Sequence, residues 1–258
     1  VQQVMAGCQG FFVDVGANSG DTVLNWFRVQ ACSEPGSTWP CLPSVPAWLT
    51  LEKRRTYCAE VFEANPRHWA RLNSTTKTLQ QNVGRRVRFH ARAFAIEDGQ
   101  VQFGLDNATR DGQGSSLVLS KRMRDTKTGK VGRGAEVRTN SISVLATDGV
   151  NFLRELGRTD LPVTLKIDVE GFEFELLREL LVSGVLCNHV NELFIEWHEG
   201  RFDWRSAALP AQENILRALY EWMLHYNKTA DKLDVDTVNT SQPATLTKHC
   251  RTRLFRWW

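Results

Sequence analysis

Residues 11–27 constrain the possible fold more than any other part of the sequence. The run Phe11–Val15 consists mostly of aromatic and β-branched residues, which predicts a short strand buried on both faces. Gly16 and Gly20 then bracket a tight turn, and residues 21–27 show the apolar spacing of a helix. Because glycine has no Cβ, the backbone of such a turn approaches a ligand closely, and the first amides of the helix face that ligand. This succession predicts the first half of a nucleotide-binding βαβ unit.

The identity of the ligand depends on Asp14, which lies inside the strand, two residues before the turn. The turn reads G-x-N-x-G rather than the full G-x-G-x-x-G dinucleotide pattern, so a structural turn that binds nothing is the alternative. An acid at this position disfavours NAD, because the pyrophosphate above such a turn is anionic. A ligand with a cationic amino-acid end and no phosphate suits Asp14 better, and S-adenosylmethionine is such a ligand.

A second candidate for ligand binding is Glu63, at the tip of a strand expected over residues 57–63. A carboxylate in this place stands beside the glycine turn and can accept both hydroxyls of a ribose. Asn65 and Pro66 follow and signal the start of a helix, expected over residues 67–82. A surface acid at a strand end is the alternative, and the preceding glycine turn favours the ribose role.

A third stretch brings charged residues to the end of a buried strand. Residues 163–167 form an apolar run that delivers Asp168 and Glu170 at its carboxyl end, where ligands of open parallel sheets bind. Lys166 lies inside the strand and therefore needs a partner. Asp168, two positions further along, is on the same face and can provide it.

The strand expected over residues 192–199 also ends in ionisable groups, Glu196 and His198, which share a face. If this strand is parallel to the previous one, the two sets of groups meet at one edge of the sheet and form a site. The alternative is a buried ion network of Lys166, Asp168 and Glu196 that only holds the strand tips.

The rest of the chain predicts further elements of an α/β fold. Strands over residues 87–95 and 100–105 are expected to form a hairpin around Glu97–Gly99. Residues 106–134 are rich in glycine and charged side chains, and predict either a flexible segment over the active face or simply a mobile loop. The other expected helices are a first helix that runs to about residue 28 and helices over 147–156, 172–181 and 213–225. The other expected strands are one over 136–144 and a final strand over 254–258 that packs against the sheet.

The cysteines and glycosylation sequons bear on the compartment. Residues 30–50 contain four prolines, which exclude a continuous helix, and Cys32 and Cys41 within this long loop are close enough in sequence to bridge. Cysteines without a metal-ligand spacing, together with N-x-S/T sequons, favour a secretory-pathway lumen (Golgi or endoplasmic reticulum) over the cytoplasm. The six cysteines are Cys8, Cys32, Cys41, Cys58, Cys187 and Cys250, and the sequons begin at Asn73, Asn107, Asn227 and Asn239.

Length and charge limit the remaining possibilities. A chain of 258 residues with this pattern predicts a single α/β domain over residues 1–258, with an insertion at about 30–50. The net charge of +3 is mild, so we expect no nucleic-acid partner. No apolar run approaches the length of a membrane span. The sequence begins at Val1 rather than at methionine, which suggests a segment of a longer protein.

Three blocks of the sequence, residues 14–21, 62–66 and 165–173, look like the signature blocks of FkbM-type methyltransferases. The resemblance covers roughly residues 11–200 and implies a class I methyltransferase fold. This is a Rossmann-like, doubly wound, mostly parallel sheet with an antiparallel C-terminal hairpin. The implied activity is methyl transfer from S-adenosylmethionine to a hydroxyl of a sugar, glycan or natural product. The chain departs from the family pattern in the long insertion at 30–50 and in Ala64, where proline is common.

The resemblance also implies roles for individual residues. In such folds the turn at Gly16–Gly20 holds the methionine part of the cofactor and the acid at Glu63 holds the ribose. The candidate cofactor-binding residues are Asp14, Gly16, Ala17, Asn18, Gly20, Asp21, Glu63, Asn65 and Ala93.

Methyl transfer to oxygen requires removal of the hydroxyl proton, and we expect Asp168 or His198 to be the base. A histidine has a suitable pKa already, whereas an aspartate needs its pKa raised by burial. A divalent cation held by Asp168, Glu170 or Glu196 would instead acidify the hydroxyl, although no spacing demands a metal. Competing hypotheses are a scaffold domain that lost its chemistry and an NAD-dependent reductase. The candidate catalytic residues are Asp168, Glu170, His198 and Lys166.

Overall fold

The structure is a computed structural model, and its elements are described over residues 7–27, 48–106, 112, 114–117, 122–124, 131–136, 140–196, 198 and 253–257. The helices are α1 Asp21–Trp26, α2 Leu51–Arg55, α3 Pro66–Val83, α4 Gly149–Gly157, α5 Glu173–Val182 and α6 Val185–His189. The strands are β1 Phe11–Val15, β2 Cys58–Phe62, β3 Val87–His90, β4 Ala93–Ala95, β5 Gly99–Leu105, β6 Arg122–Arg124, β7 Val131–Glu136, β8 Asn140–Asp148, β9 Val163–Ile167, β10 Glu192–Glu196 and β11 Arg253–Trp257.

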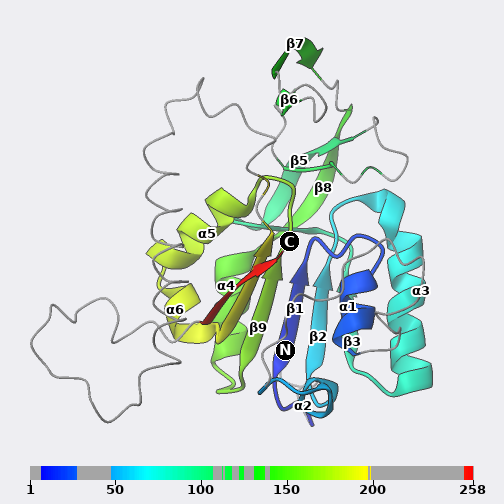
Figure 1. The fold of residues 1–258 in the computed structure, drawn as a ribbon, viewed down its shortest axis with the longest axis vertical. Helices are drawn as coiled ribbons and strands as arrows, with labels where there is room; N and C mark the ends of the chain where they lie inside the picture. Colours follow the sequence, from blue (N-terminus) through cyan, green and yellow to red (C-terminus); the bar gives the residue numbers. More distant parts are fainter. Residues whose placement is uncertain are drawn as a thin grey trace, which may run out of the picture.

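The main sheet has the strand order β11-β10-β9-β1-β2-β3, and every neighbouring pair in it is parallel (Figure 1). All its carboxyl ends therefore lie at one edge, and the strand order changes direction on the two sides of β1. This confirms the predicted doubly wound, mostly parallel α/β fold. In such sheets the crevice at the carboxyl ends, next to the point of reversal, is where ligands bind.

The alternation of side chains along the strands builds a core on each face of the sheet. Phe11, Val13 and Val15 of β1 join a core with α4, α5 and α6, whereas Phe12 joins a second core with α1 and α3. The helices accordingly stand on opposite sides of the sheet (Figure 1). A strand covered on both faces is necessarily apolar throughout, which is why β1 was predictable from its composition.

A smaller sheet of order β4-β8-β5 lies beyond the carboxyl ends of the main strands (Figure 1). It corrects the prediction of one strand over residues 87–95, because the chain leaves the main sheet after His90 and resumes as β4. The predicted hairpin between β4 and β5 is wrong as well. The strand β8 lies between them, parallel to β4 and antiparallel to β5.

Other expected elements differ in their limits. The strand predicted over 136–144 is β8, which begins at Asn140 and extends to Asp148. Asp148 then caps α4 by accepting from Asn151 N, a bond that explains why the helix begins two residues later than predicted. The strands predicted over 57–63 and 163–167 correspond to β2 and β9, and the helices predicted over 67–82 and 172–181 to α3 and α5.

The last strand, β11, lies parallel to β10 rather than in the antiparallel hairpin expected from the resemblance. A parallel pair requires a connection of about a dozen residues or more, and residues 197–252 exceed that length. The helix predicted over 213–225 and the possible Cys32–Cys41 bridge lie outside the described residues.

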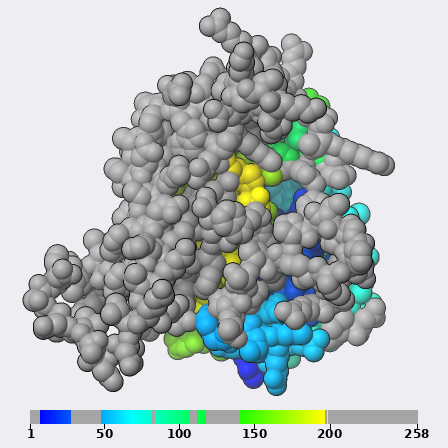
Figure 2. All heavy atoms as spheres, in the orientation of Figure 1, coloured from blue at the N-terminus to red at the C-terminus, as the bar shows by residue number. Residues whose placement is uncertain are grey.

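A disulfide joins Cys8, just before β1, to Cys58, the first residue of β2. Cys187 is disulfide-bonded as well. The amino ends of β1 and β2 lie at the bottom of the molecule together with α2, whose residues are light blue in Figure 2. The Cys8–Cys58 bridge is therefore at the edge of the sheet opposite the ligand crevice. No helix among the described residues is long and apolar enough to cross a membrane.

Candidate active site

The glycine turn after β1 is in direct backbone contact with the end of β9. Gly16 has φ +76°, and a Cβ built on it would lie 1.8 Å from the carbonyl oxygen of Asp168. The amide of Asp168 donates to the carbonyl of Val15 at 3.0 Å, which holds the two strand ends together. Only glycine satisfies both the positive φ and this close approach.

Beneath this contact lies a buried ion network centred on Lys166. Its Nζ donates to the carbonyl of Gly16 at 2.8 Å and lies 3.2 Å from Asp14 Oδ1 and 3.2 Å from Asp168 Oδ2. Burial on its own would lower the pKa of Lys166, but the two carboxylates outweigh it and the pKa is raised. Burial raises the pKa of Asp14 and Lys166 opposes that shift. The predicted pairing of Lys166 with Asp168 is confirmed, and the ammonium fixes the glycine turn from below.

Glu63 sits at the tip of β2 with both carboxylate oxygens engaged by backbone amides. Oε2 accepts from Asn18 N at 2.7 Å and Oε1 accepts from Asn65 N at 2.6 Å. Asn18 has φ +52°, and Asn65 caps α3 by accepting from Arg67 N, so the carboxylate joins the glycine turn to the start of α3. Burial raises the pKa of Glu63 to about 7, and the two amide bonds oppose part of that shift.

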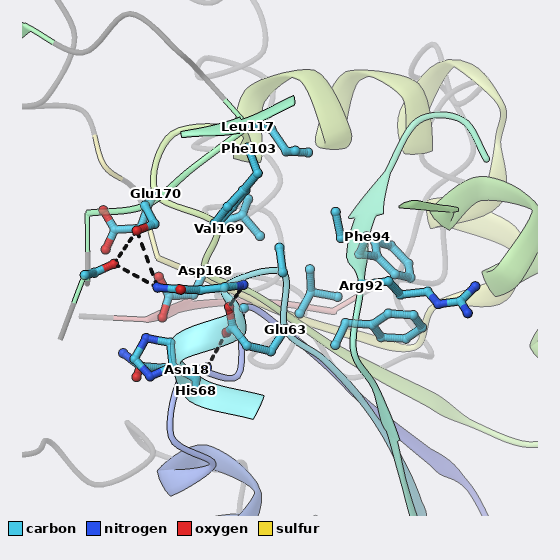
Figure 3. A pocket seen from close by; sticks show the side chains of 18 residues that line it. Asn18, Glu63, His68, Arg92, Phe94, Phe103, Leu117, Asp168, Val169 and Glu170 are labelled. Carbon is cyan, nitrogen blue, oxygen red and sulfur yellow. Dashed lines mark hydrogen bonds between the residues drawn. The ribbon is translucent and has the colours of Figure 1, made fainter. Parts of the chain in front are cut away.

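These features line one pocket at the carboxyl ends of β1, β2 and β9 (Figure 3). Several predicted site residues lie in its wall, whereas others support the wall from behind. Asp14 and Lys166 are buried below Gly16, Gly20 lies against Leu72 of α3, and Asp21 pairs with Arg71. Ala17 is buried in the core shared with α1 and α3. The predicted residues in the wall are Gly16, Asn18, Glu63, Asn65, Ala93, Asp168 and Glu170.

The opposite wall comes from segments to which the sequence assigned no site residue apart from Ala93. Arg92 and Phe94 arise where the chain passes from β3 to β4, and Phe103 belongs to β5 (Figure 3). His68 of α3 also lines the pocket. Phe94 and Phe103 belong to the small sheet, Arg92 to the link before β4, and His68 to the first turn of α3. Their only sequence signal was the position of residues 92–94 directly after a strand of the main sheet.

Part of the glycine-rich segment predicted over the active face lies on this pocket, through Gly112, Ser115 and Leu117. Ser115 Oγ donates to Gly112 O at 2.6 Å and accepts from Asp106 N at 2.9 Å. Asn65 Nδ2 donates to Gly112 O at 3.4 Å. The segment is thereby tied to the same residue that caps α3.

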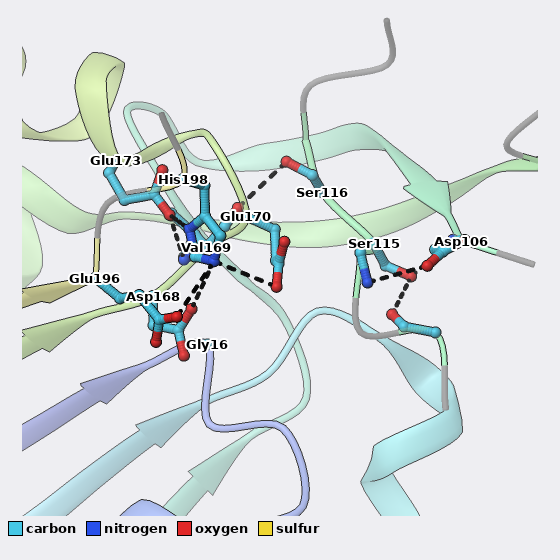
Figure 4. A network of polar contacts seen from close by, with 12 residues as sticks. Gly16, Asp106, Ser115, Ser116, Asp168, Val169, Glu170, Glu173, Glu196 and His198 are labelled. Atoms are coloured by element: carbon cyan, nitrogen blue, oxygen red, sulfur yellow. Dashed lines mark hydrogen bonds and ion pairs between the residues drawn. The ribbon is translucent and has the colours of Figure 1, made fainter. Parts of the chain in front are cut away.

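A cluster of ionisable groups lies beside the pocket, at the ends of β9 and β10 (Figure 4). His198 is 7% exposed, and its Nδ1 lies 2.6 Å from Glu173 Oε1. Its Nε2 faces Glu170 Oε1 at 3.5 Å, Asp168 Oδ1 at 3.7 Å and Glu196 Oε1 at 3.7 Å. The structure therefore brings together the groups predicted from two separate strands and adds Glu173.

The electrostatics of the cluster follow from its burial and its many carboxylates. Burial lowers the pKa of His198, but Glu173, Asp168 and Glu196 outweigh it and raise the pKa. Burial and the charge of Asp168 raise the pKa of Glu196.

Glu170 has φ +57°, an unfavourable left-handed conformation for a residue with a side chain. Gly171, with φ +110°, continues this sharp turn after β9. Non-glycine residues held in such conformations are concentrated at functional sites, where the surrounding structure offsets a cost of about 1–3 kcal/mol. The turn allows Asp168 and Glu170 to line the same pocket.

The fold and this pocket define a Rossmann-like α/β protein whose site lies at the carboxyl ends of its parallel strands. A family model described as the methyltransferase FkbM domain matches residues 14–228, and the chain belongs to this family. The resemblance noted in the sequence is thereby confirmed. Searches among curated proteins and among solved structures each gave no match.

Proposed function

We propose that this protein is an S-adenosylmethionine-dependent methyltransferase that acts on a hydroxyl group, with a sugar or glycan as the favoured acceptor and a natural product as the alternative. The observation that carries the proposal is one pocket lined by Gly16 and Glu63 together with Asp168 and Glu170. The first pair suits a nucleoside cofactor, and the second pair suits a group that loses a proton.

The residues fit S-adenosylmethionine in two respects. Gly16 itself lines the pocket, so the turn after β1 presents its backbone to a ligand there. Glu63 presents a buried carboxylate in the pocket wall, where its remaining lone pairs can accept the two ribose hydroxyls. Asp14 supports this arrangement through Lys166 rather than by lining the pocket.

Bound S-adenosylmethionine supplies an electrophilic methyl group. The chain has to position the acceptor hydroxyl and take up its proton as charge develops on oxygen. Asp168 and Glu170 are in the pocket wall and are the acceptors of that proton in this proposal. His198 faces both of these carboxylates through Nε2, at 3.7 Å from Asp168 and 3.5 Å from Glu170, and helps to position them.

The cofactor assignment is tested by titrating Glu63→Ala with S-adenosylhomocysteine. Loss of charge-assisted hydrogen bonds costs about 1.5–3 kcal/mol, which is roughly a tenfold to hundredfold loss of affinity. Glu60→Ala is the matched control, because Glu60 is a buried acid on the same strand that pairs with His90 outside the pocket. We expect Asp14→Ala also to weaken binding, through Lys166. Unchanged affinity in the folded Asp14 and Glu63 variants refutes the assignment, and tight binding of NAD favours a reductase.

The chemical roles are tested with Asp168→Asn and His198→Gln. We expect Asp168→Asn, which removes a proton acceptor, to slow methyl transfer by about 10²–10⁴-fold, and His198→Gln to slow it less. S-adenosylhomocysteine binding should change little in both, because the lost interactions act mainly in the transition state. Near-normal turnover combined with a lower melting temperature would instead show that the cluster is architectural. An intact fold that binds the cofactor but methylates no acceptor would favour a scaffold domain.

We place the protein in the secretory pathway as part of the same proposal. The Cys8–Cys58 disulfide and the exposed sequon at Asn73 support an oxidising lumen. Mass spectrometry of the protein recovered from its native source provides the test. Bridged cysteines and glycosylated sequons are expected, whereas free thiols throughout and bare asparagines would favour the cytoplasm.

A further inference from the structure

In the described part of the chain, the cluster at the ends of β9 and β10 contains more carboxylates than basic side chains. Among the described residues, carboxylates approach Lys166 or His198 from every element that meets there (Figure 4). The carboxylates are Asp14, Asp168, Glu170, Glu173 and Glu196.

The imidazole of His198 is oriented in the way that metal-ligating histidines are. Its Nδ1 is held at 2.6 Å by Glu173, a carboxylate that is itself 0% exposed and also accepts from Val169 N at 3.0 Å. A carboxylate behind one ring nitrogen fixes the ring and leaves the other nitrogen to face a cation. Within the described part of the chain, the 94% buried side chain makes no hydrogen bond through Nε2.

The spacing of the remaining atoms fits a shared cation. One ligand atom each from Asp168, Glu170 and His198 lie within 4.8 Å of one another. Nε2 of His198 is 3.5–3.7 Å from the three facing carboxylates, too far for good hydrogen bonds. Two ligands of one first-row divalent cation lie about 3–4 Å apart, since each bond is about 2.1 Å long.

We infer that Asp168, Glu170 and His198 form a site for one divalent cation, with Glu173 as the residue that positions the imidazole. Two carboxylate oxygens and one imidazole nitrogen suit a cation such as Mn²⁺, which accepts both ligand types. The side facing the pocket, where Asp168 and Glu170 are exposed to a ligand, would remain open.

The consequence for catalysis rests on the proposed function. A cation in this place would bind the acceptor hydroxyl and lower its pKa, and the proton would pass to a carboxylate oxygen of Asp168 or Glu170 that does not bind the cation. The cation site itself is independent of that proposal, because it rests on the ligand geometry alone.

The test is titration of the chelator-treated full chain with Mn²⁺, followed by pulsed electron paramagnetic resonance. We expect one Mn²⁺ per chain and modulation from a coordinated imidazole nitrogen in the unmodified protein. His198→Gln should lose the nitrogen signal and bind about tenfold more weakly or worse, and Glu173→Gln should weaken binding about tenfold to hundredfold. His90→Gln is the matched control. Nε2 of His90 lies 2.6 Å from a carboxylate oxygen of Glu60, and this pair is not part of the cluster.

Absence of Mn²⁺ binding to the unmodified protein, or binding without the nitrogen signal, overturns the inference. The two proposals fail separately. Methyl transfer that persists in excess chelator leaves the proposed function intact and removes the cation. Mn²⁺ binding with the nitrogen signal, in a protein that binds no S-adenosylhomocysteine, supports the cation site and removes the function.

Discussion

At the scale of single residues, Glu63 shows how a binding group is kept at a cost to stability. Its pKa rises from 4.5 to about 7 on folding, chiefly through burial. The native state therefore holds a proton that the unfolded chain releases above pH 4.5, and stability falls as the pH rises towards 7. The pKa shift corresponds to a loss of about 3 kcal/mol in the free energy of unfolding when Glu63 is ionised. A ligand that donates hydrogen bonds to the ionised carboxylate would restore part of that stability.

This linkage predicts a pH-dependent affinity for the cofactor. Ribose hydroxyls donate to the ionised form of Glu63, so affinity should increase with pH up to about 7, by at most about tenfold per unit, and binding near pH 7 should release protons. Calorimetric titrations with S-adenosylhomocysteine, from pH 5.5 to 8.5 in buffers of different ionisation enthalpy, measure both quantities. Glu63→Gln should bind more weakly and lose the proton release. A constant affinity over this range in the unmodified protein would contradict the prediction.

At the scale of elements, the contact between β1 and β9 depends on Gly16. We expect Gly16→Ala to unfold the site or to destabilise the protein by more than about 2 kcal/mol, because the new Cβ meets the backbone of Asp168. Gly84→Ala is the control, since Gly84 also has a positive φ, +63°, but has nothing within 4 Å of its Cβ position. The control should lose only about 1–2 kcal/mol. Denaturant unfolding of both variants measures the difference, and equal losses would show that the close approach is unimportant.

The elements that the sequence predicted well are those whose surroundings are uniform. β1, β2 and β9 are covered on both faces, so their composition alone identified them. The end of β3 at His90 was not predictable, because no glycine or proline marks it. It depends on the pairing of Ala93–Ala95 with β8, more than fifty residues away in the sequence.

The residues of the candidate site also divide into those that the sequence predicted and those that it did not. Glu63, Asp168 and Glu170 were predictable because they follow strands whose carboxyl ends had to meet. Arg92 and Phe103 were not, because their places depend on the small sheet. Glu173 was not predicted as a site residue, although it lies in the signature block, because its role depends on its contact with Nδ1 of His198.

At the scale of the whole molecule, the Cys8–Cys58 disulfide closes a loop with a sequence separation of 50 residues at the amino ends of β1 and β2. Replacing both cysteines with serine should lower the free energy of unfolding by about 4 kcal/mol in the chain-entropy description. Affinity for S-adenosylhomocysteine in the folded variant should be unchanged, because the bridge lies at the opposite edge of the sheet. Urea unfolding and ligand titration test both parts. A variant as stable as the parent, or one that folds and no longer binds, contradicts the prediction. The variant is preferable to a reductant, which would also act on the disulfide of Cys187.

The position of β1 in the middle of the sheet also affects how the chain folds as it is made. Phe11 pairs with Cys58 on one side and with Val163 on the other. At about 5–20 residues per second, on the order of ten seconds pass between synthesis of the two neighbouring strands. During that interval an apolar strand edge of the nascent chain has no partner and is open to aggregation. Early oxidation of Cys8 and Cys58 would hold β1 in register on β2 during that interval, so the disulfide would protect the central strand before its second neighbour is made.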